Sequence, residues 1–166
     1  MADKATDVTS NITNPGFDGN TTGWTLDGAY GNRQIKPSND AVEFWLYVDH
    51  RAEGWFDYFQ TLSVPNGYYI LSADMFNSLN GETGAIFKPT ICLYTNNGSF
   101  DERVEVDQEG DYFNTYSTHA IEVTNGTLRI GVKNFDEIAA RWFVADNFRL
   151  TRIEYDTEST RAHEMR

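Results

Sequence analysis

The chain lacks a second cysteine and any long apolar run. Its one cysteine, Cys92, excludes an internal disulfide framework and a thiolate-based zinc cluster, and between Ile91 and Leu93 it is predicted to be a small buried residue of a strand. No stretch approaches the roughly 20 apolar residues of a membrane-spanning helix. No apolar segment follows Met1-Ala2-Asp3-Lys4, as a signal peptide would require. The chain is therefore either cytosolic or a piece of a longer protein.

Positive charge is scarce. The 166 residues include 13 Lys and Arg against 25 Asp and Glu, for a formal net charge of −12. Such a surface repels phosphate backbones and anionic lipids, so nucleic acids and membrane surfaces are poor partners. Neutral ligands and divalent cations suit this charge better.

Helical periodicity is also missing. Turn dipeptides such as Asp-Gly and Asn-Gly recur along the chain, and short runs rich in β-branched and aromatic residues separate them. This pattern predicts an all-β fold, an antiparallel sandwich or barrel. The length suits one domain over 11–155, with polar tails at 1–10 and 156–166. The predicted strands are 22–27, 41–48, 55–64, 67–76, 86–95, 115–123, 127–133 and 142–153.

Aromatic residues make up 14% of the chain, more than a core of this size needs, so some are expected at the surface. The segment 41–48 alternates strictly. Val42, Phe44, Leu46 and Val48 are expected on the core face, which places Glu43, Trp45 and Tyr47 on the other. A row of a carboxylate and two large rings on an outer face favours a ligand platform. The alternative is that a loop covers Trp45.

Four motifs occur in a characteristic order: Asn14-Pro15-Gly16-Phe17-Asp18, Gly23-Trp24, Gly67-Tyr68-Tyr69-Ile70-Leu71-Ser72 and Phe143-Val144-Ala145-Asp146-Asn147. In this order the chain resembles carbohydrate-binding modules of families four, nine and twenty-two, which share a galactose-binding-like jelly roll. The strands around Trp45 and Phe59 look especially like modules of Bacteroidetes xylanases and glucanases. The resemblance covers residues 11–153.

The resemblance implies a non-catalytic module that binds internal stretches of a β-linked plant polysaccharide, xylan first and mixed-linkage β-glucan second. It implies that the module targets a covalently attached glycoside hydrolase, such as an endo-xylanase, to that polysaccharide. The parent protein would then be extracellular, cell-surface or periplasmic in a bacterium. We expect the module to be a monomer.

The resemblance also implies a structural calcium ion between the first and last strands. Asp18 and Asp146 match the family's acidic positions, and Asn39 and Asp40 of a nearby loop are expected to contribute further oxygens. Calcium takes six to eight oxygen ligands, many of them backbone carbonyls. The alternative is that the aspartates hydrogen-bond to turn amides.

Sugar binding needs flat rings for the C–H faces of pyranoses and directed polar groups for their hydroxyls. Trp45 is the first candidate. In 69–76, Tyr69 and Leu71 are expected inside and Ser72, Asp74 and Phe76 outside, while Trp24 is expected in the core. The candidate glycan-binding residues are Glu43, Trp45, Tyr47, Arg51, Trp55, Asp74, Phe76, Tyr94, Asn96, Tyr112 and Trp142.

A catalytic alternative rests on Glu105, Asp107 and Glu109, which spell the Glu-x-Asp-x-Glu pattern of family-sixteen jelly-roll glucanases. Retaining hydrolysis needs two carboxyl groups about 5–5.5 Å apart, which neighbouring positions on one strand face could supply. The segment runs directly into Gly110-Asp111, so an acidic loop or solvated strand is favoured. Protein adhesion through the same sandwich is a third possibility, because fold does not fix function.

Overall fold

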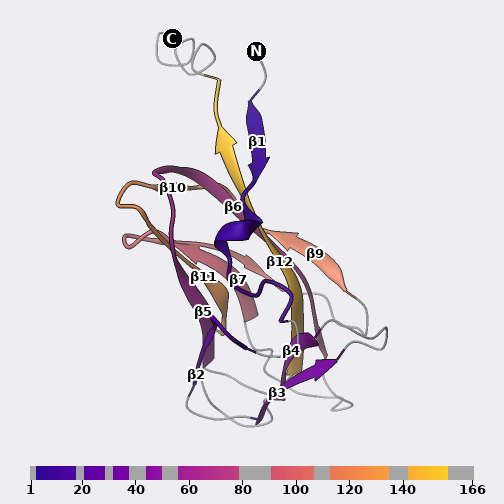
Figure 1. Ribbon diagram of the computed structural model, residues 1–166. Coiled ribbons are helices and arrows are strands. Elements are labelled where there is room, and N and C mark those ends of the chain that lie inside the picture. The colour runs from indigo at the N-terminus through magenta and orange to yellow at the C-terminus, as the bar shows by residue number, and fades with distance from the viewer. Residues whose placement is uncertain are drawn as a thin grey trace.

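The chain folds into two antiparallel β-sheets packed face to face (Figure 1). The computed structural model describes residues 3–17, 21–28, 32–37, 44–49, 56–78, 91–106, 113–134 and 142–156; at 28, 32–37, 44–49, 56, 77–78, 134 and 142–143 it describes the backbone path alone. The strands are β1 (Lys4–Asp7), β2 (Thr25–Gly28), β3 (Asn32–Pro37), β4 (Phe44–Asp49), β5 (Phe56–Ser63), β6 (Gly67–Ser78), β7 (Ile91–Asn96), β8 (Asp101–Glu105), β9 (Asn114–Ser117), β10 (Ile121–Val123), β11 (Thr127–Asn134) and β12 (Trp142–Glu154).

The seven-stranded sheet has the order β10-β6-β12-β4-β3, with β1 paired to β12 and β9 paired to β6. The five-stranded sheet has the order β2-β5-β11-β7-β8. The predicted all-β antiparallel sandwich is thus confirmed. The described part of the chain has one short 3-10 helix, η1 (Thr9–Asn11), and no helix long and apolar enough to cross a membrane.

Three strands were not predicted: β1, β3 and β8. The expected N-terminal tail is wrong at residues 4–7, which form β1 and pair with β12 from Lys4↔Glu154 to Asp7↔Thr151. The single strand expected over 115–123 is two strands, because Thr118 interrupts it. The backbone N–H of Thr118 donates to the Leu71 carbonyl, and its hydroxyl accepts the Leu71 N–H at 3.1 Å.

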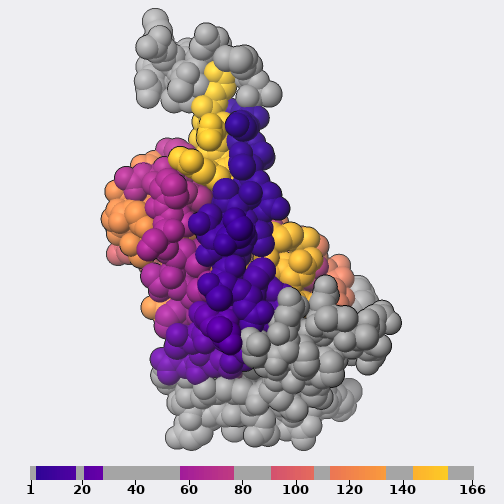
Figure 2. All heavy atoms as spheres, viewed as in Figure 1, coloured from indigo at the N-terminus to yellow at the C-terminus, as the bar shows by residue number. Residues whose placement is uncertain are grey.

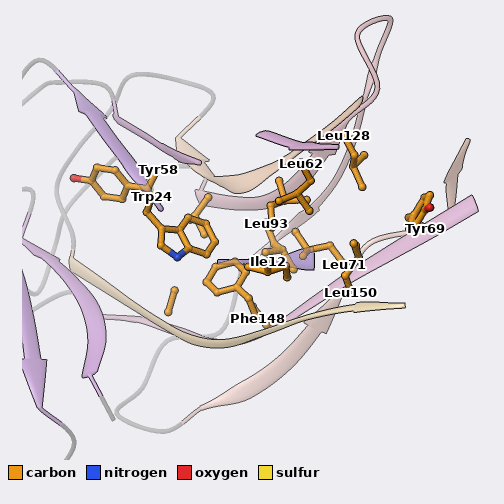
Figure 3. Packing of buried hydrophobic residues seen from close by; sticks show 14 of the residues in the cluster. Ile12, Trp24, Tyr58, Leu62, Tyr69, Leu71, Leu93, Leu128, Phe148 and Leu150 are labelled. Atoms are coloured by element: carbon orange, nitrogen blue, oxygen red, sulfur yellow. The ribbon is translucent and has the colours of Figure 1, made fainter. Parts of the chain in front are cut away.

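The core lies between the sheets and is built by alternation along each strand (Figure 3). In β6, the residues Tyr69, Leu71, Ala73 and Met75 are buried in it, which confirms the predicted inward side of this strand. The two labelled rings Trp24 and Phe148 approach each other in Figure 3, with their centroids 4.8 Å apart. Trp24 therefore belongs to the core, as its Gly-Trp motif predicted.

The N-terminal turn, residues 12–17, is tied to this core by ring contacts and hydrogen bonds. Phe17 stacks on Trp24 with ring centroids 4.9 Å apart, and the Trp24 indole N–H donates to the Asn14 carbonyl at 2.9 Å. Gly23 has a φ of +88°, and a Cβ there would lie 2.6 Å from the Thr13 methyl carbon. The Gly-Trp motif thus needs its glycine both for the backbone conformation and for space.

Residues 8–17 then run along β12 and take the place of a neighbouring strand (Figure 2). The N–H of Val8 donates to the Leu150 carbonyl at 2.8 Å, and the N–H of Phe148 donates to the Pro15 carbonyl at 3.0 Å. On this edge, the first residues of β12, up to Ala145, pair with β4. The residues of β12 after Ala145 are instead bonded to the N-terminal segment.

We predict that Gln60→Ala destabilises the fold by loosening the N-terminal turn. The buried Gln60 amide accepts the Thr13 N–H at 2.6 Å and donates to the Thr13 carbonyl at 2.9 Å. Unpairing both groups is expected to lower the free energy of unfolding by about 1–3 kcal/mol, measured by urea denaturation. The neighbouring Thr61→Ala, at an exposed position, is the control and should change it by less than about 0.5 kcal/mol. Equal stabilities for the two variants would contradict this role.

Candidate functional site

The outward surface of the five-stranded sheet carries a charged and aromatic cluster. The core takes alternate residues of each strand, such as Tyr58 and Leu62 of β5 and Ile130 of β11, so the residues between them face outward. The register aligns one outward row across all five strands: Thr25, Phe59, Gly131, Tyr94 and Arg103. We call this surface, from Thr25 to Arg103 and including Asp57 and Arg129, the five-stranded face.

Three side chains from three adjacent strands close a ring of hydrogen bonds on this face. The Tyr94 hydroxyl donates to Asp57 Oδ1 at 2.6 Å, and Arg129 Nη2 donates to Asp57 Oδ2 at 2.8 Å. Arg129 Nε donates to the Tyr94 hydroxyl oxygen at 3.2 Å, which completes the ring. Each member thus fixes the other two, and both oxygens of the Asp57 carboxylate have a donor.

The Arg129 guanidinium is held against a ring as well. Its central carbon lies 3.4 Å from the centroid of Phe59. Gly131 lies between Phe59 and Tyr94 in the outward row, and because it has no side chain the space between these two residues is left open. The Arg129 side chain can therefore cross from its own row, beside Thr61 and Asn96, to Asp57. Stacking and two hydrogen bonds hold the guanidinium plane in one orientation.

Burial and charge keep the ring in one protonation pattern. Burial of Tyr94 and its hydrogen bond to Asp57 raise the pKa of the Tyr94 hydroxyl far above its usual value, so it stays a donor at neutral pH. The Asp57 side chain is 12% exposed, whereas the Arg129 side chain is 38% exposed. Arg129 is thus the part of the ring that a ligand in solvent can reach, and its remaining N–H groups suit hydroxyl oxygens.

Two predicted site residues lie on the five-stranded face. Tyr94 is only 2% exposed, so the prediction that its ring meets a ligand is wrong: it orients Asp57 and Arg129 instead. Asn96 is half-buried, donates to Asp101 Oδ1 at 2.9 Å and accepts the Gly98 N–H at 2.7 Å. Sequence reasoning missed Asp57, Phe59 and Arg129. The alternation of polar and apolar residues could have identified them, since Arg129 is a polar residue between Leu128 and Ile130 in an otherwise apolar strand.

Other predicted residues belong to the opposite, seven-stranded sheet. The register aligns Tyr47 of β4 with Val144 and Phe76, and it pairs Trp45 with Lys36 and Trp142 with Asp49 and Ser78. Phe76 is 7% exposed and packs edge-on against Phe113, so the prediction of an open Phe76 ring is wrong. Trp45 and Trp142 remain predictions, as does Tyr47.

Asp74, also predicted, is the centre of a second hydrogen-bonded cluster on this sheet. Its Oδ1 accepts the Thr115 hydroxyl at 2.7 Å and Arg149 Nη2 at 3.0 Å, and its Oδ2 accepts the Asn147 amide at 2.9 Å. Burial raises the pKa of Asp74, but these hydrogen bonds and the Arg149 charge together lower it below its usual value. Ionised Asp74 therefore stabilises the fold at neutral pH, and this contribution is lost as the pH falls below about 4.

Several predicted residues fall outside the described part of the chain: Glu43, Arg51, Trp55 and Tyr112 for glycan, and Asp18, Asn39 and Asp40 for calcium. Asp146 is described and is 7% exposed, and its Oδ1 accepts the Asn147 N–H at 2.7 Å. Within the described ranges, no three His, Cys, Asp or Glu residues are placed to hold a metal ion.

The catalytic alternative is weakened by the position of β8. This strand ends at Glu105, whose side chain is exposed, and the next residue, Val106, is buried and bonded through its N–H to the Ile91 carbonyl. Asp107 and Glu109 lie beyond the described residues. Of the three carboxylates, Glu105 is described and stands at the last position of β8.

No protein-family model and no curated protein matches the chain. Solved structures do match it. A family 61 carbohydrate-binding module in complex with β-1,4-galactotriose is 22% identical, with a TM-score of 0.67 over 86% of this chain and 97% of that one. A second match is a Clostridium thermocellum endo-1,4-β-D-xylanase, solved with xylohexaose, which joins a family 22 carbohydrate-binding module to a family 10 glycoside hydrolase module. It is 12% identical, with a TM-score of 0.60 over 85% of this chain and 28% of that one.

A Stig cyclase from Fischerella sp. is also similar, at 19% identity and a TM-score of 0.62 over 92% of this chain and 99% of that one. At these identities the likeness shows the fold, a jelly-roll sandwich shared with carbohydrate-binding modules, as the motifs predicted. The same sandwich serves a cyclase, so function must be inferred from the side chains on its faces.

We predict that Gly131→Ala distorts the five-stranded face. A Cβ at Gly131 would collide with the Tyr58 carbonyl oxygen and approach Phe59 Cα to 3.0 Å. Both are backbone atoms, so the whole of β5 would have to shift to make room. The expected loss is about 1–3 kcal/mol in the free energy of unfolding, measured by urea denaturation. Thr127→Ala is the matched control, since Thr127 is an exposed residue of the same strand. A Gly131→Ala protein as stable as this control would show that β5 and β11 are not so closely paired.

Proposed function

We propose that this protein is a non-catalytic carbohydrate-binding module and that the five-stranded face is its binding surface. The observation that carries the proposal is the ring of Asp57, Tyr94 and Arg129, which fixes a partly exposed guanidinium over Phe59. A guanidinium fixed in this way supplies a flat surface for a pyranose and directed donors for adjacent hydroxyls. Because its orientation is set before binding, little side-chain entropy is lost when a sugar arrives.

The ligand we propose is a neutral β-linked plant polysaccharide, with xylan first and mixed-linkage β-glucan second. The face of a sheet suits an extended polysaccharide chain that lies across the strands. A terminal sugar would instead need a pocket that encloses it. Such a surface is shallow and keeps much water, so we expect dissociation constants between about 1 μM and 1 mM, or roughly −8 to −4 kcal/mol. In a parent protein the module would hold an attached glycoside hydrolase, outside the cell, against its substrate.

We predict that Arg129→Lys weakens glycan binding at least about tenfold, or 1.4 kcal/mol, because lysine keeps the charge but loses the planar fork. Affinity electrophoresis on soluble xylan and mixed-linkage glucan would find the ligand, and calorimetry with xylohexaose and cellohexaose would measure it. Thr127→Ala is the control and should bind like the wild type. No reducing ends should be released in these samples, and steady release that Glu105→Gln abolishes would favour the hydrolase alternative.

Trp45→Ala tests the other placement, in which the residues of β4 bind the sugar. If Trp45→Ala abolishes binding at an unchanged melting temperature while Arg129→Lys does not weaken it, the site lies on the seven-stranded sheet. If the polysaccharides and oligosaccharides fail to bind the wild type at millimolar concentrations, the proposed function is wrong.

We further propose that Asp146 helps to hold a structural calcium ion. Asp146 is a buried carboxylate at the point where β12 leaves β4 and meets the N-terminal turn, which contains the Pro15 carbonyl and continues to Asp18. Oxygen donors from both chain ends are what a hard cation such as calcium needs. The ion would join the two ends of the domain.

We predict that chelation lowers the melting temperature. At a calcium concentration 100 times the dissociation constant, binding stabilises the native state by about 2.7 kcal/mol, or roughly 5–10 °C for a domain of this size. Scanning calorimetry with calcium and with excess EDTA measures this difference. Asp146→Asn should melt lower and no longer respond to EDTA. An unchanged wild-type melt together with no metal by elemental analysis would refute the calcium site.

A further inference from the structure

The second cluster described above forms a patch on the seven-stranded sheet, on the side of the sandwich opposite Arg129. We call it the Asp74 patch: Asp74 of β6, Thr115 of β9, Asn147 and Arg149 of β12, and Phe113 just before β9. Next to it the hydroxyls of Ser72 and Ser117 lie 2.8 Å apart. Hydroxyl, amide and guanidinium groups thus come together from three adjacent strands.

An aromatic ring borders these polar groups. Phe113 is 38% exposed, and its ring meets that of Phe76 edge-on, with centroids 4.9 Å apart and an interplanar angle of 77°. Phe76 is itself buried, so it supports Phe113 from one side. Phe113 is two residues from Thr115, whose hydroxyl binds Asp74. A supported and partly exposed ring beside directed polar groups is the combination that binds a pyranose.

The patch repeats the chemistry of the five-stranded face. In both places a carboxylate accepts one hydroxyl and one arginine, and an aromatic ring lies close by. The Arg149 side chain is 39% exposed and that of Arg129 is 38% exposed. The two arginines lie on opposite outer surfaces of packed sheets that are about 10 Å apart, so one sugar unit cannot contact both.

A purely structural role explains part of the patch. The pairing of β12 with β6 shifts between Asp146 and Arg149, and Asn147 adopts a φ of +54° in this bulge. The bond from Asn147 to Asp74 fixes the bulge. The bulge does not require the Arg149 guanidinium or the exposed Phe113 ring. Solvent, and therefore a ligand, can reach both of these residues, as it can the exposed Thr115 and Asn147.

Charge indicates the class of ligand. Asp74 and Arg149 neutralise each other, so the five residues of the patch have no net charge of their own, while the nearby carboxylates of Asp7 and Asp146 add negative charge beside it on a protein that carries −12. A neutral, hydroxyl-rich ligand matches this, and an anionic one does not. We propose that the Asp74 patch is a second carbohydrate-binding surface, which makes the protein bivalent. For its ligand class the inference rests on the proposed function.

Bivalency would change how the protein holds a polysaccharide. Two weak sites on opposite faces bind two chains, or two stretches of one chain, and the second contact is made at a high effective concentration. The protein should then cross-link soluble polysaccharide. A monomer with a single binding surface cannot cross-link polysaccharide chains.

The test uses nuclear magnetic resonance, which detects weak binding residue by residue. The ¹⁵N-labelled protein, saturated with calcium, is titrated with xylohexaose and, separately, with cellohexaose. We expect the Nε–Hε signals of both Arg129 and Arg149 to shift, each along its own binding curve. Arg149→Lys should abolish the shifts around Asp74 and leave those around Arg129 in place. Arg129→Lys, the matched variant, should do the reverse. Phe113→Ala should weaken only the Asp74 patch, at least about fivefold, without disturbing the Asp74–Arg149 pair.

Each result separates the two proposals. Shifts only around Arg129, unaffected by Arg149→Lys and Phe113→Ala, would overturn the second surface and leave the first intact. Shifts only around Asp74 would support the patch and overturn the placement of binding at Arg129. No shift with either oligosaccharide at 10 mM, in a protein that retains xylan or glucan in affinity gels, would overturn the patch as a site for these sugars. No shift and no retention would overturn both proposals.

Discussion

The pairing of β12 with β6 is the constraint on which the seven-stranded sheet depends. β1 and β4 pair with β12, β9 and β10 pair with β6, and β3 pairs with β4, so each strand is joined to this central pair directly or through β4. The register shift between Asp146 and Arg149 turns Phe148 into the core, where its ring meets Phe17 and Trp24. One bulge therefore connects the sheet, the N-terminal turn and the largest aromatic contacts of the core.

Both outer faces contain a partly buried carboxylate, and burying a carboxylate is costly unless its oxygens are bonded. Asp57 meets this condition with Tyr94 and Arg129, and Asp74 meets it with Thr115, Asn147 and Arg149. Neither sheet needs an arginine at this place in order to fill its core, because the inward residues of the same strands already do so. Fully bonded charge on a surface instead holds an arginine in one orientation, which is the property a weak binding site needs.

The sandwich itself does not separate binding from catalysis. Similar structures include a module solved with galactotriose and a cyclase, both at low identity. In this chain the outward residues lie on strands whose inward residues fill the core. A change of Arg129 or Phe59 would alter the chemistry of the face without altering the packing of Leu128 or Ile130 behind it. In this fold, function can therefore vary while the core is kept.

The sequence alone determined the fold class and much of the core, because both follow from local pattern. Dense turn residues and short alternating runs predicted the sandwich, and the motifs containing Trp24 and Tyr69 placed these rings inside. It could not find β1, whose polar residues 4–7 form a strand only because the end of β12 lies beside them. It also assigned Asp74 and Tyr94 to one list of ligand contacts, although they lie on opposite sheets. Alternation tells which side of its own strand a residue takes, and only the pairing of distant strands decides which residues share a surface. The ring of Asp57, Tyr94 and Arg129 joins residues 35 to 72 positions apart, and for that reason only the tertiary structure could assemble it.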